Sequence, residues 1–101
     1  MIKHIVIFRL TPPFTPEEKE ASVKKLGEIF GPLGKSLGFP LEYRTGVNIL
    51  KAEHAGDFVI DSLFASEEDL KRYTLSAEHT AAVSAASAVI KTKIIVDYVV
   101  S

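Results

Sequence analysis

The segment at residues 2–10 most constrains the fold of this chain, because apolar side chains occupy both of its alternating faces. It is rich in β-branched and aromatic residues, which predicts a β-strand. One face carries Ile2, His4, Val6, Phe8 and Leu10, and the other carries Lys3, Ile5, Ile7 and Arg9. A strand that is apolar on both faces is typically covered on each side. We therefore expect both faces of this strand to be covered.

A helix start follows the strand. Residues 11–14 contain two prolines and are expected to form a rigid exit from the strand. Thr15 is a predicted N-cap, with Pro16 at the first helical position and Glu18 placed to complete a capping box. An apolar stripe at helical spacing comes next, formed by Val23, Leu26, Phe30 and Leu33. We expect Pro32 to interrupt this helix, because the residue before a proline avoids the α conformation.

The remaining segments complete a β-α-β-β-α-β order. A second helix is predicted to start at Ser66, to break near residues 74–76 and to resume as an alanine-rich helix to about residue 90. Three further strands are predicted over residues 41–50, 58–64 and 92–100, with an irregular return over 34–40 and a polar turn over 51–57. This order is typical of the ferredoxin-like arrangement of an α+β protein. We expect a single domain over residues 1–101, with both helical regions on one face of an antiparallel sheet.

The other face of this sheet is predicted to be apolar. It would expose Ile5, Ile7 and Val59 to water, and an apolar patch of this kind usually marks a partner surface. Two copies packed sheet to sheet would cover the patch in both. We therefore expect a homodimer through sheet-to-sheet packing.

Composition excludes several classes of function. The 101 residues include 12 basic and 13 acidic side chains, and no basic stripe points to nucleic acid or to a membrane surface. The absence of cysteine excludes disulfides, thiolate catalysis and Cys-based zinc sites. The sequence shows no secretory signal and no apolar run of the ~20 residues that a membrane span needs. Phosphate-loop, serine-hydrolase and zinc-protease motifs are also absent, so we expect a cytoplasmic protein without a cofactor.

His79, Tyr73 and His4 are the candidate catalytic residues. An unperturbed histidine titrates near ~6.5, so His79 could act as a general base at neutral pH. Tyr73 could donate a hydrogen bond to a carbonyl oxygen, and His4 could orient the substrate. The structural alternatives are that His79 stabilises a helix start, that Tyr73 belongs to the core, and that His4 bonds a neighbouring backbone group or carboxylate. Between helix and sheet, the predicted ligand-binding wall consists of Val6, Phe8, Leu26 and Ile60.

The other titratable groups favour structural interpretations. His54 lies in a polar turn with Glu53 and Asp57, but these residues lack a defined ligand spacing, so no metal site is predicted. Asp57 and Asp61 lie at alternate positions on one strand face, and Asp97 lies on another strand. We expect edge protection or ion pairs with Arg9 or Lys93 rather than acid–base work.

Four segments, in their order and spacing, resemble the stress-responsive A/B barrel domain family. They are the opening residues 1–10, Gly46-Val47-Asn48, residues 64–70 together with Tyr73, and Ile95-Val96-Asp97-Tyr98. The resemblance implies a dimeric α/β barrel in which two ferredoxin-like protomers pack their sheets back to back. A plant polyketide cyclase of the family closes a linear chain by aldol condensation without a cofactor, and its site residues match His4, Tyr73 and His79.

The resemblance has departures that bear on the substrate. Ser76 stands where the cyclase has a further histidine, Ala77 replaces a proline, and Leu26 replaces a pocket tyrosine. We therefore expect a differently shaped cavity and do not carry over the substrate. The leading hypothesis is cofactor-independent proton transfer, of the aldol or cyclase type, on a small carbonyl compound. The alternatives are a non-catalytic metabolite-binding or stress-protective dimer and, less favoured because the chain has no tryptophan, a cofactor-free monooxygenase of the antibiotic-biosynthesis type.

Overall fold

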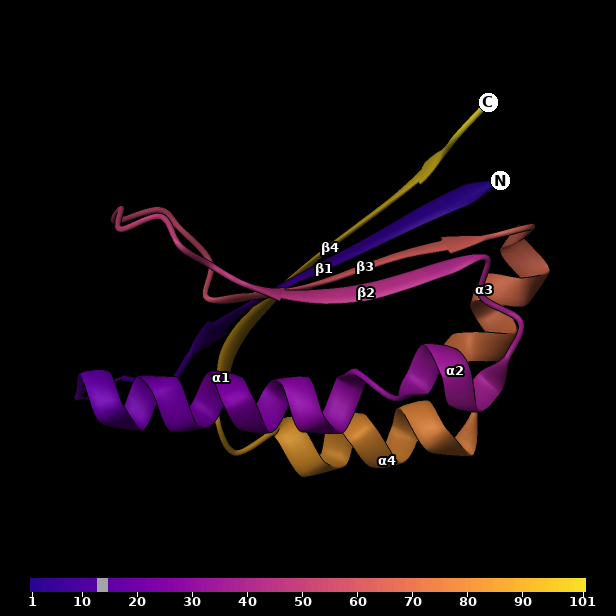
Figure 1. Ribbon diagram of the computed structural model, residues 1–101. Coiled ribbons are helices and arrows are strands. Elements are labelled where there is room, and N and C mark those ends of the chain that lie inside the picture. Colours follow the sequence, from indigo (N-terminus) through magenta and orange to yellow (C-terminus); the bar gives the residue numbers. More distant parts are fainter. Residues whose placement is uncertain (13–14) are drawn as a thin grey trace.

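An antiparallel sheet with helices on one face forms the fold in the computed structural model, which describes residues 1–12 and 15–101 (Figure 1). The elements in chain order are β1 (Ile2–Leu10), α1 (Pro16–Phe30), α2 (Leu33–Leu37), β2 (Glu42–Val47), β3 (Phe58–Phe64), α3 (Glu67–Thr74), α4 (Ala77–Ala86) and β4 (Ile90–Val99). This arrangement confirms the predicted α+β, ferredoxin-like class. Residues 13–14 of the predicted rigid exit lie outside the described residues.

The strand β1 lies inside the sheet, and the helices cover one of the two faces that were expected to be covered. The strand order is β2-β3-β1-β4, so β1 pairs with β3 on one side and with β4 on the other. Every inner-face side chain of β1 is buried, and the inner face of β3 is buried in the same way. These strands and the apolar stripe of α1 share one core, because Val23, Leu26 and Phe30 pack against the inner face.

The predicted helix starts are confirmed by their caps. Thr15 and Glu18 form the full capping box, in which the Thr15 hydroxyl accepts from the Glu18 N–H and the Glu18 carboxylate accepts from the Thr15 N–H. Ser66 caps α3, and Ser76 caps α4 by accepting from the His79 N–H at 3.1 Å. The break between α3 and α4 therefore lies where the sequence predicts it, and the cap of the new helix lies three residues before His79.

Three boundaries differ from the predictions. The expected irregular return contains α2, which begins beside Pro32 and ends at Gly38, a glycine in the left-handed conformation with φ 78°. The strand predicted over 41–50 ends at Val47, because the Asn48 side chain bonds both backbone groups of Leu50 in a local turn. The alanine-rich helix ends at Ala86 rather than near residue 90, where the chain already enters β4.

The sheet face away from the helices is apolar, as the sequence predicts. In cross-strand register, Ile5 lies beside Val96, and Ile7 lies beside Val59 and Ile94. The β4 side chains on this face are about half exposed, at 53% for Ile94, 49% for Val96 and 51% for Tyr98. The described residues form no helix that combines the length and apolar character needed to cross a membrane.

Candidate functional site

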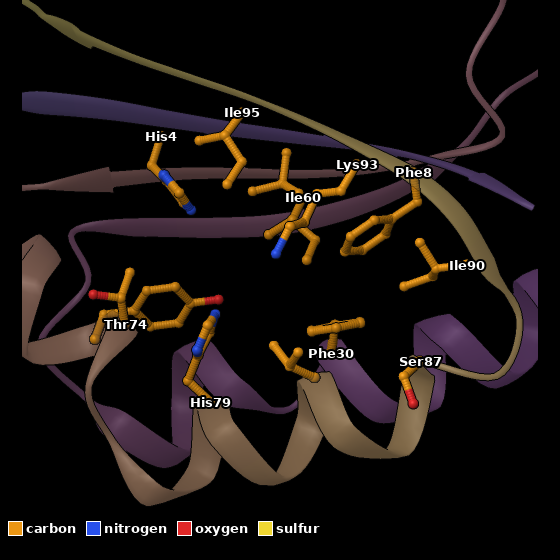
Figure 2. Close-up of a pocket in the computed structure, with 13 residues that line it drawn as sticks. His4, Phe8, Phe30, Ile60, Thr74, His79, Ser87, Ile90, Lys93 and Ile95 are labelled. Atoms are coloured by element: carbon orange, nitrogen blue, oxygen red, sulfur yellow. The ribbon is translucent and has the colours of Figure 1, made fainter.

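A cavity of about 240 Å³ lies between the inner face of the sheet and α4 (Figure 2). The sheet contributes His4, Val6, Phe8, Ile60, Lys93 and Ile95, and the helical regions contribute Phe30, Tyr73, Thr74, His79 and Val83. The three predicted catalytic side chains thus share one cavity although they come from β1, α3 and α4. Most of the other lining side chains are apolar, so the polar chemistry is confined to a few groups.

His4 reaches the cavity from the middle of the sheet. Its residue is only 3% exposed, and its Nδ1 contacts the carboxylate of Asp97, the residue opposite it on β4. This contact favours the tautomer whose Nδ1–H donates to the carboxylate, so that Nε2 remains available on the cavity side. Figure 2 shows the ring directed from β1 into the cavity. Asp97 therefore pairs with His4 and not with Arg9 or Lys93, which corrects the sequence-based expectation.

A row of polar side chains crosses the sheet at the level of His4. The cross-strand register aligns Tyr43 with Ser62, Ser62 with His4, and His4 with Asp97. Ser62 is fully buried and donates to the His4 carbonyl at 3.2 Å. The sequence reasoning missed Tyr43 as a site residue. Tyr43 lies on the same face of the sheet as the buried residues of the neighbouring strand β3. The alternation of side chains along β2 is therefore the signal that could have placed Tyr43 here.

Tyr73 lies between the two histidines. Its ring centroid is 5.9 Å from that of His4 and 4.7 Å from that of His79, both in edge-to-face contact. Its hydroxyl lies 3.4 Å from the Tyr43 hydroxyl. Burial raises the pKa of both phenols, with the Tyr43 contact partly offsetting the rise in the pKa of Tyr73. Tyr73 is therefore a neutral hydroxyl that can donate at physiological pH.

His79 lies on α4, is half-buried and lines the same cavity as Tyr73 and His4. Burial is the main cause that lowers the pKa of His79 below 6.5, and a hydrogen bond with the Thr74 backbone acts in the opposite direction. Electrostatic interactions with His4 and Lys93 also lower the pKa of His79. The neutral imidazole therefore predominates at pH 7, which is the form that accepts a proton.

The predicted ligand-binding wall is only partly present. Val6, Phe8 and Ile60 line the cavity, but Leu26 does not. Leu26 is fully buried in the core, and Phe30, one turn later on α1, lines the cavity in its place. The sequence reasoning also missed the cavity position of Lys93. It alternates with Ile95 and Asp97 on the inner face of β4, and this alternation is the available signal.

The remaining carboxylates and His54 lie away from this cavity. Asp57 accepts from the Leu10 N–H at 2.9 Å and pairs with Lys19 at 3.0 Å. Asp61 pairs with Lys3 at 2.6 Å, so the expected ion pairs exist but with other lysines. His54 is exposed in the loop before β3. Within residues 1–12 and 15–101, no group of three or more His, Cys, Asp and Glu side chains could hold a metal ion.

We predict that replacing Lys93 with methionine raises the pKa of His79. The substitution removes a positive charge that disfavours the imidazolium, and it keeps an unbranched side chain. The pKa is measured by NMR titration of the His79 ring protons. Lys91→Met is the matched control, because it removes an equal charge from the same strand without touching the cavity. An unchanged His79 pKa in Lys93→Met would contradict the electrostatic coupling.

The fold and the cavity define a class of small α+β proteins with a ligand-sized space between helices and sheet. The chain belongs to the Stress responsive A/B Barrel Domain (Dabb) family, whose pattern it matches over residues 2–100. No curated protein shows a significant match to the chain.

Solved structures share this fold at low sequence identity. A dimeric protein of unknown function and ferredoxin-like fold from Bacteroides fragilis is 26% identical, with a TM-score of 0.83 over 96% of this chain and 93% of the other. The hydroxynitrile lyase from Passiflora edulis is 13% identical, with a TM-score of 0.78 over 99% and 93% of the two chains. An antibiotic biosynthesis monooxygenase is 17% identical, with a TM-score of 0.74 over 100% of this chain and 99% of the other.

Proposed function

We propose that this protein is a cofactor-independent enzyme that moves a proton next to the carbonyl group of a small, mostly apolar substrate, as in an aldol-type cyclisation. The observation that carries the proposal is the edge-to-face contact of His79 with Tyr73 at a cavity that His4 also lines. A base and a hydroxyl donor side by side suit the formation of an enolate, because one removes the proton and the other stabilises the oxygen that becomes negative.

Each side chain has a distinct role in the proposed reaction. His79 takes the proton from the carbon next to the carbonyl, and the electrons of the broken C–H bond pass to the carbonyl oxygen. Tyr73, whose hydroxyl contacts that of Tyr43, donates a hydrogen bond to this oxygen. His4, held by Asp97, orients the substrate. The enolate carbon can then attack a second carbonyl of the same molecule, and His79 returns its proton to the resulting alkoxide.

The test is proton exchange in deuterated water. The protein is incubated with a panel of 1,3-diketones, polyketide-like esters and aldehydes, and deuterium at the carbon next to the carbonyl is followed by NMR. We expect at least one compound to exchange faster with the protein than in buffer alone. A panel with no such compound would favour the non-catalytic alternative, in which the same apolar cavity binds a metabolite without turnover.

The third candidate, a cofactor-free monooxygenase, receives support from the shared fold alone. It predicts oxygen consumption rather than solvent exchange, so an oxygen electrode with the same panel separates it from proton transfer. A cytoplasmic location and a role in stress stay predictions from the sequence.

We also propose that the protein is a homodimer through the apolar sheet face. The support is the half-exposed row of apolar side chains on β4 together with the dimeric state of the Bacteroides fragilis protein. Val96→Glu is expected to yield monomers, because a carboxylate buried without a partner raises the dissociation constant on the order of 100-fold or more. Sedimentation at micromolar concentration measures this. Leu75→Glu, at a 72% exposed helix end, is the control and should remain dimeric.

A further inference from the structure

The cavity lining contains several groups that can carry positive charge and no carboxylate. Its lining includes His4, His79 and Lys93, but no aspartate or glutamate. Asp97 contacts His4 and is not part of the lining. Among the described residues, no carboxylate lies within ion-pair distance of Lys93, whereas His4 pairs with Asp97. Lys93 is therefore a lysine without a carboxylate partner in the lining of a mostly apolar cavity.

The orientation of Lys93 makes this charge available to a ligand. Lys93 lies opposite Phe8 in the sheet register, on the inner face of the edge strand β4. Figure 2 shows the Lys93 side chain directed from β4 into the cavity, which His79 enters from the helix on the opposite side. Many exposed lysines on an edge strand extend into water, where their charge is fully hydrated. Lys93 is also exposed, but its side chain lines the cavity beside the apolar wall formed by Phe8, Phe30 and Ile60.

The size of the cavity limits the ligand. A cavity of about 150 Å³ in a protein core accommodates benzene, and this one measures about 240 Å³. The space suits a molecule with one ring, or an equivalent folded chain, and a short polar extension. The apolar part would lie against Phe8, Phe30 and Ile60, while polar atoms would meet His79 and Tyr73 at one end and Lys93 beside them.

We propose that the substrate is a small carbonyl compound carrying a carboxylate, and that Lys93 selects it by binding that carboxylate. This inference rests on the proposed function, because it names the substrate class for the same cavity. Lys93 binds the substrate away from the reacting carbon and is a specificity residue rather than the base. The bound carboxylate also offsets the charge that repels a proton from His79, so binding makes His79 a stronger base.

The test compares two probes of nearly equal size and shape, the anionic 3-phenylpropanoate and the neutral 3-phenylpropanamide, by NMR titration of the whole protein. We expect the unmodified protein to bind the acid about tenfold more tightly than the amide, because a hydrogen bond to a charged group is stronger than one to a neutral group. Lys93→Met should abolish this preference by weakening the binding of the acid without changing the binding of the amide. Lys93→Arg should keep it, and so should Lys91→Met, which removes an equal charge outside the cavity.

The proposal is overturned if the unmodified protein binds the two probes equally or binds neither at millimolar concentration. It is also overturned if Lys93→Met weakens the binding of the acid and of the amide by the same factor. These outcomes are separate from those of the proposed function. If His79→Gln leaves proton exchange unchanged, the catalytic proposal fails, but the titration still decides whether Lys93 selects a carboxylate.

Discussion

Replacing His79 with glutamine is expected to lower the rate of proton exchange on an accepted carbonyl substrate by ~10²–10⁴. Glutamine keeps a polar side chain of similar reach but cannot take up a proton at neutral pH. The helix start should survive, because the cap uses the His79 backbone N–H and the Ser76 hydroxyl, and neither is changed. The rate is measured by deuterium incorporation, and substrate affinity is measured separately by titration.

His54→Gln is the matched control for this substitution. His54 is an exposed histidine in the loop before β3 and does not line the cavity, so its variant should exchange at the original rate. A His79→Gln protein with the original rate would exclude His79 as the base. A loss of the same size in His54→Gln would trace the effect to something other than the cavity.

The pH dependence of the same rate gives a further signature of His79. Burial lowers the pKa of His79 below 6.5, so the neutral base forms at lower pH than in an exposed histidine. The rate should therefore rise with pH, reach half of its maximum below pH 6.5 and stay level through neutrality. A half-maximum well above 6.5 would point to another base.

Local sequence signals predicted most of the fold. The composition of residues 2–10 predicted the strand β1, and the segments around Thr15, Ser66 and residues 74–77 predicted three helix starts. These features depend on a few residues that are neighbours in the sequence, so a local sequence pattern is enough to predict them. The short helix α2 and the early end of β2 depend on Gly38 and Asn48, whose effects compete with the apolar alternation around them.

The site was less predictable, because it depends on register between distant strands. Which carboxylate meets His4 follows from the pairing of β1 with β4, and a shift of two residues would bring another side chain to Asp97. Leu26 and Phe30 share one helical stripe, and only the position of the helix along the sheet decides which one lines the cavity. Sequence spacing gives the face of an element but not its position against its neighbours.

Phe64 packs against the site residues Tyr73 and His4. Replacing Phe64 with alanine is expected to lower the free energy of unfolding by about 3–5 kcal/mol. The side chain is fully buried, and its ring lies 5.2 Å from that of Tyr73 and 6.3 Å from that of His4. Truncation leaves a void beneath both residues, so the lost packing adds to the lost burial. Urea unfolding at fixed protein concentration measures the change, because dimerisation makes stability depend on concentration.

Two variants keep this prediction decisive. A domain of this size has a total stability of roughly 5–15 kcal/mol, so Phe64→Ala could leave little folded protein. Phe64→Leu keeps most of the volume and should cost less than half as much, and Leu75→Ala, at a 72% exposed position, should cost almost nothing. If the Phe64→Leu protein folds fully yet exchanges protons more slowly, the Phe64 ring positions Tyr73 and His4 in addition to filling the core. Equal, small losses in all three variants would contradict a packed core beneath the site.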